Sequence, residues 1–514
     1  MSYGKPCSLK SSSGRWILLA TTLASGASFL AGTAVPVALP EIQSRFNTAL
    51  SGIQWVVNAN LLFLGALILV GGALGDHYGR KRIFTLGMAL FGVAALFSGL
   101  APSIGMLLSL QALQGTGSAL MVPQSLAIIN DCFAESERGR AIGLWAGISG
   151  GIAALGPLAG GWLVDKFSWS AIFFMVVPVS IAALFISLLF VPGTRPSKAH
   201  RLDWPGSITI LIGLFGLAYG LMTGPNTGWE SPSVVASLLV GSIAIGVFIF
   251  IETRQRQPLV YLSIFKKPLV TGANAVTLLV YFGLNGVIFF TVLNLQQVQG
   301  YSPTQAGLAL LPPIVLITFL TWPTGVLADK LGPRLQMILG PLLVSAGMAF
   351  LALGGPDANY LLHFLPGLAL FGIGMAVVIP PLTKCALAVE SRFSGSASGI
   401  NNGIARVAGL LAIAILGAMI ITLFQTRLAA ELSQSNLTGQ EQQQILIQAD
   451  KLGGIVIPNA FNQAAREETL KAIHSAFIYG FRRAMIVCAV LAFGGAVVSI
   501  SLIRNENKQP GGDI

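Results

Sequence analysis

Long hydrophobic stretches, separated by short polar segments, run along almost the whole chain. Each stretch holds about twenty residues, the length that an α-helix needs to cross the hydrocarbon core of a bilayer. This pattern predicts fourteen membrane-spanning helices. They are expected at residues 16–38, 53–75, 83–101, 105–129, 141–163, 170–192, 205–223, 234–252, 269–293, 304–326, 336–354, 361–385, 397–424 and 479–503.

Two polar segments lie outside these stretches. Residues 193–204 form a short basic loop between the sixth and seventh hydrophobic stretches. Residues 425–478 form a long loop before the last stretch and contain EQQQILIQADKL and AREETLKAIHSAF, whose hydrophobic positions have helical periodicity. We expect one or two amphipathic helices in this long loop, on the outer surface.

The composition excludes a soluble globular protein. Of 514 residues, 54% are hydrophobic and only 10% are charged, whereas soluble domains carry about 25% charged residues. The net charge of +11 could suggest a nucleic-acid partner, but the cations lie in short loops and form no basic face. We therefore expect a multi-pass membrane protein and no nucleic-acid partner.

The cations also predict an orientation. If the N-terminus is cytoplasmic, most Lys and Arg residues lie in cytoplasmic loops, and the short loops on the other side hold only Arg45 and Lys166. This asymmetry follows the positive-inside rule. Fourteen spans then place both termini, residues 1–15 and 504–514, in the cytoplasm, and we expect the plasma (inner) membrane.

One loop sequence occurs twice in the chain. Residues 72–81 read GALGDHYGRK, and residues 325–334 read GVLADKLGPR. Both copies follow a hydrophobic stretch, in predicted cytoplasmic loops. Two halves that carry the same loop on the same face indicate parallel internal repeats, an arrangement typical of transporters.

The repeated loop has the residues of a gate. A glycine permits a tight reversal, and Asp76 can cap a neighbouring helix or pair with Arg138 or Arg140. Such a contact would hold the cytoplasmic side shut; the alternative is that the cations only set topology. The gate candidates are Gly72, Asp76, Gly79, Arg80, Lys81, Arg138, Arg140, Asp329 and Arg334.

This loop resembles the signature of the major facilitator superfamily. The fourteen stretches, the extra pair at 205–252 and the long loop 425–478 are similar to its 14-helix drug:proton antiporter branch. Further matches are the segments ALP (38–40), LQGTGSA (113–119), DWPG (203–206) and GYSP (300–303). The resemblance implies an all-α major facilitator fold. It would comprise a six-helix bundle (16–192), a cytoplasmic linker (193–204), an inserted helix pair (205–252), a cytoplasmic loop (253–268) and a second six-helix bundle (269–503).

The fifth stretch holds a row of small residues. Gly147 and Gly151 have small-xxx-small spacing, and the segment GPLAGG at 156–161 continues this row. Such a row lets another helix approach closely, and a proline bends the helix there. The segment, with Gly156, Pro157, Gly160 and Gly161, resembles the antiporter motif that in the family is thought to close the outer side. The alternative is a role in packing alone.

The departures from the family pattern concern proton coupling. The family usually has an Asp in the first helix and an Arg in the fourth, where this chain has Ala31 and Gln111. No Asp or Glu falls at the centre of a hydrophobic stretch, although a proton relay normally needs an intramembrane ionisable group. Proton antiport is therefore doubtful.

One cation does lie within a hydrophobic stretch. Arg406 costs about 2.5–3.5 kcal/mol at such a position on insertion scales, so it should face the bundle interior, water or a carbonyl partner. A role in the cytoplasmic gate and a role in substrate contact are both open. Neutral polar and aromatic residues could line a cavity with it, or could hydrogen-bond between helices. The cavity candidates are Asn58, Asn60, Gln111, Gln114, Tyr281, Asn285, Asn294, Asn401, Asn402 and Arg406.

These features predict a secondary transporter that works by alternating access, and the resemblance implies export of small amphipathic or drug-like molecules. An uncoupled facilitator or a lipid or glycolipid translocator is the alternative. A non-transporting membrane receptor or enzyme is the rival from another class, but the four histidines are scattered. No Walker loop is found, so ATP is not the direct energy source. We expect no catalytic residues, cofactor or metal, and as partners a small amphipathic substrate or lipid, membrane lipids and no second subunit.

Overall fold

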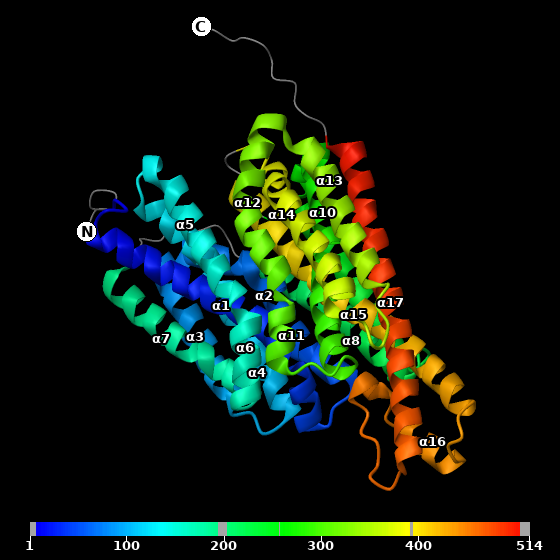
Figure 1. The fold of residues 1–514 in the computed structure, drawn as a ribbon. Coiled ribbons are helices and arrows are strands. Elements are labelled where there is room, and N and C mark those ends of the chain that lie inside the picture. Colours follow the sequence, from blue (N-terminus) through cyan, green and yellow to red (C-terminus); the bar gives the residue numbers. More distant parts are fainter. Residues whose placement is uncertain (1–6, 194–202, 256–257, 391–393, 504–514) are drawn as a thin grey trace.

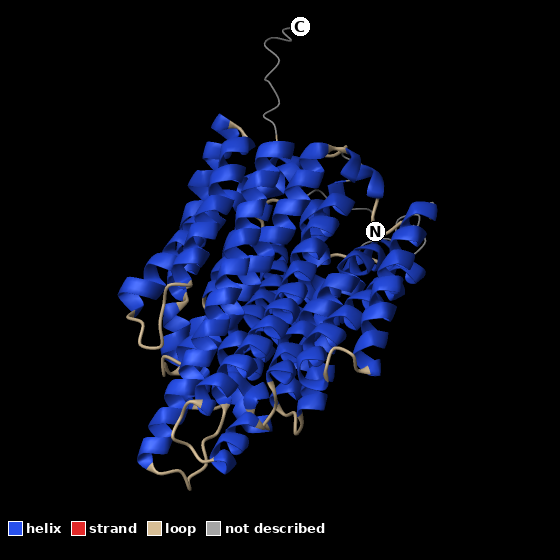
Figure 2. Ribbon diagram, turned by 90° about the vertical axis from the view of Figure 1, so that its right-hand side faces the viewer, coloured by secondary structure: helices blue, strands red, loops and turns tan. Residues whose placement is uncertain are grey.

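The computed structural model is built from helices (Figures 1 and 2) and describes residues 7–193, 203–255, 258–390 and 394–503. Within these ranges the only strand-like pairing is an isolated bridge between Cys7 and Phe133. The termini 1–6 and 504–514, and most of the predicted linker 193–204, lie outside the described residues. The predicted all-α fold class is confirmed.

The first group of helices, which we call the first bundle, covers the first third of the chain. Its fifth hydrophobic stretch forms two helices that meet at Leu155, because Pro157 cannot continue a regular helix. The helices are α1 (Ser12–Phe46), α2 (Leu50–Tyr78), α3 (Arg80–Gly99), α4 (Ile104–Cys132), α5 (Glu135–Ala154), α6 (Gly156–Lys166) and α7 (Ala171–Phe190).

A hairpin of two helices follows, α8 (Trp204–Thr227) and α9 (Pro232–Arg254). Asp203 caps α8 by accepting a hydrogen bond from the amide of Gly206 at 2.8 Å. The two helices approach closely where Gly216 of α8 faces Gly241 of α9. Helix α8 also packs against α2 and α15, so the hairpin lies beside both bundles.

The second bundle packs its helices in the same pairs as the first. It differs in which stretch is broken, because here the second hydrophobic stretch is divided at Leu310, ahead of two prolines. Its elements are η1 (Leu262–Lys266), α10 (Pro268–Gln297), α11 (Pro303–Ala309), α12 (Leu311–Leu331), α13 (Pro333–Leu351), η2 (Tyr360–Phe364), α14 (Leu365–Ala386), α15 (Ser394–Ser433), α16 (Gly439–Leu446), η4 (Ala449–Gly454) and α17 (Gln463–Leu502).

Thirteen helical segments in the described part of the chain are long and apolar enough to cross a membrane. Helix α4 is not among them, although it has 29 residues and packs against α2 and α3. Three buried glutamines, Gln111, Gln114 and Gln124, make it more polar than its neighbours. The count of fourteen spans therefore stays a prediction for this one helix.

The long loop before the last span is largely helical, and its last part belongs to the helix of that span. Its first amphipathic segment forms α16, which begins with a capping box between Thr438 and Glu441. Hydrogen bonds from Thr438 hold the pKa of the Glu441 carboxyl below its usual range. The second segment is no separate helix, because it is the first part of the 40-residue α17.

The molecule has two distinct ends (Figure 1). We call the end with the α2–α3 and α12–α13 turns the inner end, following the predicted orientation, and the end with α16 the outer end. In Figure 1 the inner end is at the top, where α5 and α12 stand apart, and the outer end is at the bottom.

Candidate functional site

At the outer end the two bundles meet along α6 and α11, a contact that we call the α6–α11 seam. A β-carbon on Gly161 would overlap the carbonyl oxygen of Pro303, and one on Gly307 would overlap that of Pro157. Close backbone approach therefore requires glycine at both positions. Asp165, at the end of α6, caps this seam by accepting hydrogen bonds from the Ser302 hydroxyl at 3.0 Å and from both the amide (2.9 Å) and hydroxyl of Thr304.

A second outer contact joins α1, α10 and the turn η4. The amide nitrogen of Gln43 donates to the carbonyl of Lys451 at 3.1 Å, and the side-chain oxygen of Gln43 accepts from Gln297 at 2.8 Å. Gln296 donates to the carbonyl of Val37 at 2.8 Å. The side chain of Leu452, which has a positive φ of 54°, is buried in the turn. The long outer loop thus connects the two bundles across the outer end.

The bundles also meet on another side, along α2 and α15, which we call the α2–α15 seam. Near its outer end Gln54 donates to the carbonyl of Ile413 at 2.5 Å, and Asn58 donates to that of Leu410 at 3.4 Å. Contact continues toward the inner end, where Gly399 lies against the side chain of Leu69. Helix α8 covers this seam with an apolar cluster formed by Leu62, Leu214, Ala218, Met222, Leu410 and Ala414.

The inner halves of α5 and α12 are not in close contact. Gly147 and Gly151 of α5 have no atom within 4 Å of an added β-carbon, so the predicted close approach at these two glycines is wrong for this conformation. The residues that do pack closely are Gly156, Gly160 and Gly161 at the outer half of the same stretch. On α12, Phe319 and Trp322 are 73% and 79% exposed. The bundles are therefore separated on this side at the inner end.

The repeated loop adopts the same conformation in both halves. Gly79 and Gly332 have φ values of 99° and 81°, which favour glycine, and each joins two helices directly. In the first copy, Arg80 pairs with Asp76 at 3.0 Å and with Asp131 at 2.6 Å. Asp76 therefore pairs with Arg80 of its own turn, and the expected pairing with Arg138 or Arg140 is wrong for this conformation.

Three of the remaining gate candidates have partners within their own bundle, whereas no side-chain hydrogen bond or ion pair of Arg138 or Arg140 is found in the described part of the chain. Lys81 donates to the carbonyl of Leu188 at 2.8 Å. In the second copy, Asp329 pairs with Lys384 at 2.7 Å, and Arg334 approaches the carbonyl of Ile500 at 3.5 Å. Gly72 lies in open space. Among the described residues, none of the ion pairs found joins the two bundles.

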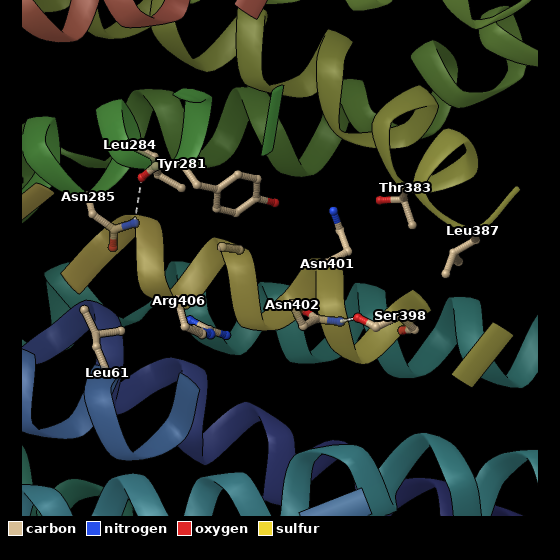
Figure 3. Close-up of a pocket in the computed structure, with 11 residues that line it drawn as sticks. Leu61, Tyr281, Leu284, Asn285, Thr383, Leu387, Ser398, Asn401, Asn402 and Arg406 are labelled. Atoms are coloured by element: carbon tan, nitrogen blue, oxygen red, sulfur yellow. Dashed lines mark hydrogen bonds between the residues drawn. The ribbon is translucent and has the colours of Figure 1, made fainter. Parts of the chain in front are cut away.

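A cavity of about 240 Å³ lies between α2 of the first bundle and α10, α14 and α15 of the second (Figure 3). Arg406 and Asn402 face it from α15, and Tyr281 faces it from α10. None of its lining residues is an Asp or Glu, among the residues that the structure describes. The lining residues are Leu61, Tyr281, Leu284, Asn285, Thr383, Leu387, Ser398, Asn401, Asn402, Ala405 and Arg406.

Several polar groups of the cavity are already bound to the protein. The amide nitrogen of Asn401 donates to Thr277 at 2.7 Å and thereby joins α15 to α10. Those of Asn402 and Asn285 donate to the carbonyls of Ser398 and Tyr281, at 2.9 and 2.8 Å (Figure 3). These three amides position the helices and leave their oxygens as acceptors.

The structure places five of the ten cavity candidates in this cavity: Tyr281, Asn285, Asn401, Asn402 and Arg406. The other five lie elsewhere. Asn58 is in the α2–α15 seam, Gln111 donates to Ser98 and to Gln114 within the first bundle, and Asn60 and Asn294 are outside the cavity lining.

Two polar residues of the cavity, Thr383 and Ser398, are not among the candidates predicted from the sequence. Helical spacing could have predicted Ser398. It lies one turn before Asn401 and Asn402 on α15, and two turns before Ala405 and Arg406, so all five residues share one face of the helix. Thr383 could not be found this way, because its place in the cavity depends on how α14 packs against α15.

The fold and the repeated loop are typical of one family of transporters, and the sequence of the chain matches the same family. The sequence model described as Major Facilitator Superfamily matches residues 21–413. The chain belongs to the major facilitator superfamily. It is therefore an integral, multi-pass membrane protein of a transporter family.

Relatives in this superfamily are drug-resistance and export proteins. The chain is 31% identical to the multidrug resistance protein Stp of Mycobacterium tuberculosis, over 81% of this chain and 78% of the relative. It is 36% identical to the puromycin resistance protein pur8 of Streptomyces alboniger, over 78% and 80%. It is 28% identical to the tetracenomycin C resistance and export protein of Streptomyces glaucescens, over 93% and 89%. These relatives fit the 14-helix drug:proton antiporter branch.

Solved structures of the superfamily share the fold. A bacterial homologue of the human lysosomal transporter Spinster, in an inward-facing and unoccupied conformation, matches with a TM-score of 0.67 at 16% identity. The match covers 96% of this chain and 98% of that chain. At this identity the likeness establishes the major facilitator fold alone.

Proposed function

We propose that this protein exports small amphipathic, drug-like molecules across the cytoplasmic membrane by alternating access. The observation that carries the proposal is the cavity around Arg406, which lies between two bundles that are joined at the outer end and separated between α5 and α12 at the inner end. This geometry corresponds to a transporter conformation that is open inward. The names of the drug-resistance relatives support export as the direction.

The proposed coupling differs from that of a proton antiporter. No carboxylate lines the cavity within the described residues. Ala31 is buried in the apolar core of the first bundle, and Gln111 is bound to Ser98 and Gln114. A proton relay through the membrane normally needs an ionisable group at depth. An uncoupled facilitator or a lipid translocator is therefore the second candidate for the mode of transport.

Drug-susceptibility assays test the export. The protein is expressed in a bacterium whose own efflux pumps are deleted, and the inhibitory concentrations of a panel of amphipathic antibiotics, puromycin included, are measured. We expect resistance to at least one compound, together with lower accumulation of it in the cells. Wild-type protein that is present in the membrane and changes neither quantity for any compound would contradict export.

Reconstitution tests the coupling. Purified protein in liposomes should move an exported compound at a rate that does not change when a pH gradient is imposed, because no acid group is available in the cavity. Flux that depends on the pH gradient would contradict this mode while leaving export intact.

Chemical labelling of single cysteines at Arg82 and Gln443 from each side of intact cells tests the proposed cytoplasmic inner end and the plasma-membrane location.

A further inference from the structure

Arg406 is the one cation that lines the cavity, and no described residue balances its charge. No hydrogen bond or ion pair to its guanidinium is found among the described residues, and the cavity lining holds no Asp or Glu. The Arg406 side chain is half-buried, and a guanidinium without a partner inside a membrane span is costly. Its β-carbon lies 3.1 Å from the position that a β-carbon would take on Gly65 of α2, so the side chain begins at the contact between the two bundles.

The other polar groups in the cavity include acceptors, the side-chain oxygens of Asn285, Asn401 and Asn402, as well as hydroxyl groups that can donate. The amide nitrogens of Asn285, Asn401 and Asn402 are bound to the protein, but the hydroxyls of Tyr281 and Ser398 have no partner among the described residues. These two hydroxyls lie on the same cavity as Arg406. Beside the asparagine amides, these two hydroxyls and the Arg406 guanidinium can donate to a ligand, and the guanidinium carries the one positive charge of the lining.

Apart from Thr383, whose hydroxyl donates to the carbonyl of Ile379 at 3.0 Å, the rest of the lining is apolar. Leu61, Leu284, Leu387 and Ala405 come from α2, α10, the end of α14 and α15. A ligand that pairs with the guanidinium and packs against these apolar side chains has a hydrophobic body and an anionic head group. A guanidinium binds planar or tetrahedral oxyanions such as carboxylates and sulfonates with two parallel hydrogen bonds.

We propose that Arg406, with Tyr281 and Ser398, binds the head group of an amphipathic anion, and that the membrane potential drives its export. This inference rests on the proposed function and names its substrate class. A bacterial membrane is negative inside, so a monovalent anion moves outward down the potential without a coupled proton. A potential of about 100 mV supports a gradient of roughly fiftyfold for one elementary charge. Transport of this kind needs no acid in the cavity.

Binding to the purified wild-type protein is the first test. Three fluorescent probes share a naphthylethyl body and carry a sulfonate, a hydroxyl or a trimethylammonium group. We expect the sulfonate to bind at least about tenfold more tightly than the trimethylammonium, which is the ratio that one charge-assisted hydrogen bond provides. Equal affinities for the three probes would overturn the inference, and this comparison requires no variant.

Substitutions assign the preference to Arg406. Arg406→Gln should weaken sulfonate binding about tenfold or more and leave binding of the hydroxyl probe nearly unchanged, whereas Arg406→Lys should recover part of the loss. Arg427→Gln is the matched control, because Arg427 lies on the same helix at the outer end, paired with Glu431. A sulfonate preference that persists in Arg406→Gln would overturn the assignment.

Flux in liposomes tests the driving force. A potassium gradient with valinomycin sets the potential, and the sulfonate should leave the inner-facing compartment faster as that compartment becomes more negative. A pH gradient should have no effect. Sulfonate flux that ignores the potential would overturn the driving force proposed here.

The outcomes also separate this inference from the proposed function. If cells expressing the protein export drugs but the purified protein binds the three probes equally, export stands and anion recognition fails. If neither cells nor liposomes show export of any compound, the proposed function fails, and the inference that rests on it fails too.

Discussion

The two seams between the bundles are held in different ways. The α6–α11 seam is short, lies at the outer end and depends on two backbone contacts made possible by Gly161 and Gly307. The α2–α15 seam is long, runs from Gln54 at the outer end to Leu69 toward the inner end, and is covered by α8. The inner end is therefore separated on the α5–α12 side, while the opposite side stays joined.

This difference assigns a role to the inserted hairpin. Met222 of α8 is 2% exposed and lies where α8 meets α2 and α15, with its sulfur 3.3 Å from the amide of Asn58. A helix that packs on both bundles at once stabilises the seam beneath it. The separation at the inner end accordingly lies on the α5–α12 side, which α8 does not cover.

Gly161→Val should have the largest effect, because it acts on the shorter of the two seams. The new side chain would overlap the backbone of Pro303, and such overpacking costs about 1–3 kcal/mol. The outer end should then open more readily and transport should fall about tenfold or more. Spin labels at Ser44 and Asp357, in a background without Cys7, should report a longer distance across the outer end.

Gly246→Val is the control for this substitution. Gly246 lies on α9 with no atom within 4 Å of an added β-carbon, so transport and the label distance should stay at wild-type values. If Gly161→Val keeps both the wild-type rate and the wild-type distance, the α6–α11 seam does not depend on this glycine.

Met222→Ala should have the next largest effect and tests the covered seam. Truncation of a buried methionine leaves a cavity and costs about 2 kcal/mol or more of the free energy of unfolding. The melting temperature in detergent, followed by tryptophan fluorescence, should fall. Val240→Ala on α9 is the control, since Val240 is 51% exposed. Equal melting temperatures for the two variants would argue against a brace formed by α8.

Gln43→Ala tests the contact between the bundles and the outer turn. It removes the hydrogen bond to the Lys451 carbonyl and the acceptor of Gln297, at a cost of about 1–2 kcal/mol. Leu452→Cys, buried in the same turn, should then react roughly tenfold faster with an impermeant maleimide. The exposed Gln443→Ala should leave the labelling rate unchanged; a similar acceleration in that control would show general loosening of the loop.

Much of the fold could be predicted because it depends on local properties of the chain. Apolar length predicts the helices, and the break at Leu155 follows from Pro157. The glycine in each copy of the repeated loop has the positive φ that a tight reversal requires. Apolar length alone does not identify helix α4 as a span. Its buried glutamines lower the mean hydropathy of its sequence, although the helix packs inside the bundle.

The site could be predicted only in part because its geometry depends on contacts between distant residues. Gln43 and Lys451 are 408 residues apart, and no local pattern indicates their contact. The partner of Asp76 depends on packing within the first bundle, because Arg80 pairs with Asp76 of its own turn and with Asp131 at the end of α4. In the same way, Gly147 and Gly161 share one row of small residues, but only Gly161 lies at the seam.

Asp165→Asn should have the smallest effect, because it changes the cap of the α6–α11 seam and leaves the backbone contacts intact. The asparagine keeps one oxygen that can accept from the Thr304 amide but loses the charge that strengthens three hydrogen bonds. Because Asp165 is exposed, loss of its charge should destabilise the closed outer end by less than about 1 kcal/mol. The population of molecules that are open at the outer end should therefore rise about two- to fivefold. The distance between labels at Ser44 and Asp357 measures this population.

Glu41→Gln, which removes an exposed carboxylate of α1, should leave this population unchanged. An effect of Asp165→Asn as large as that of Gly161→Val would mean that the cap, rather than the close approach of the two backbones, holds this seam.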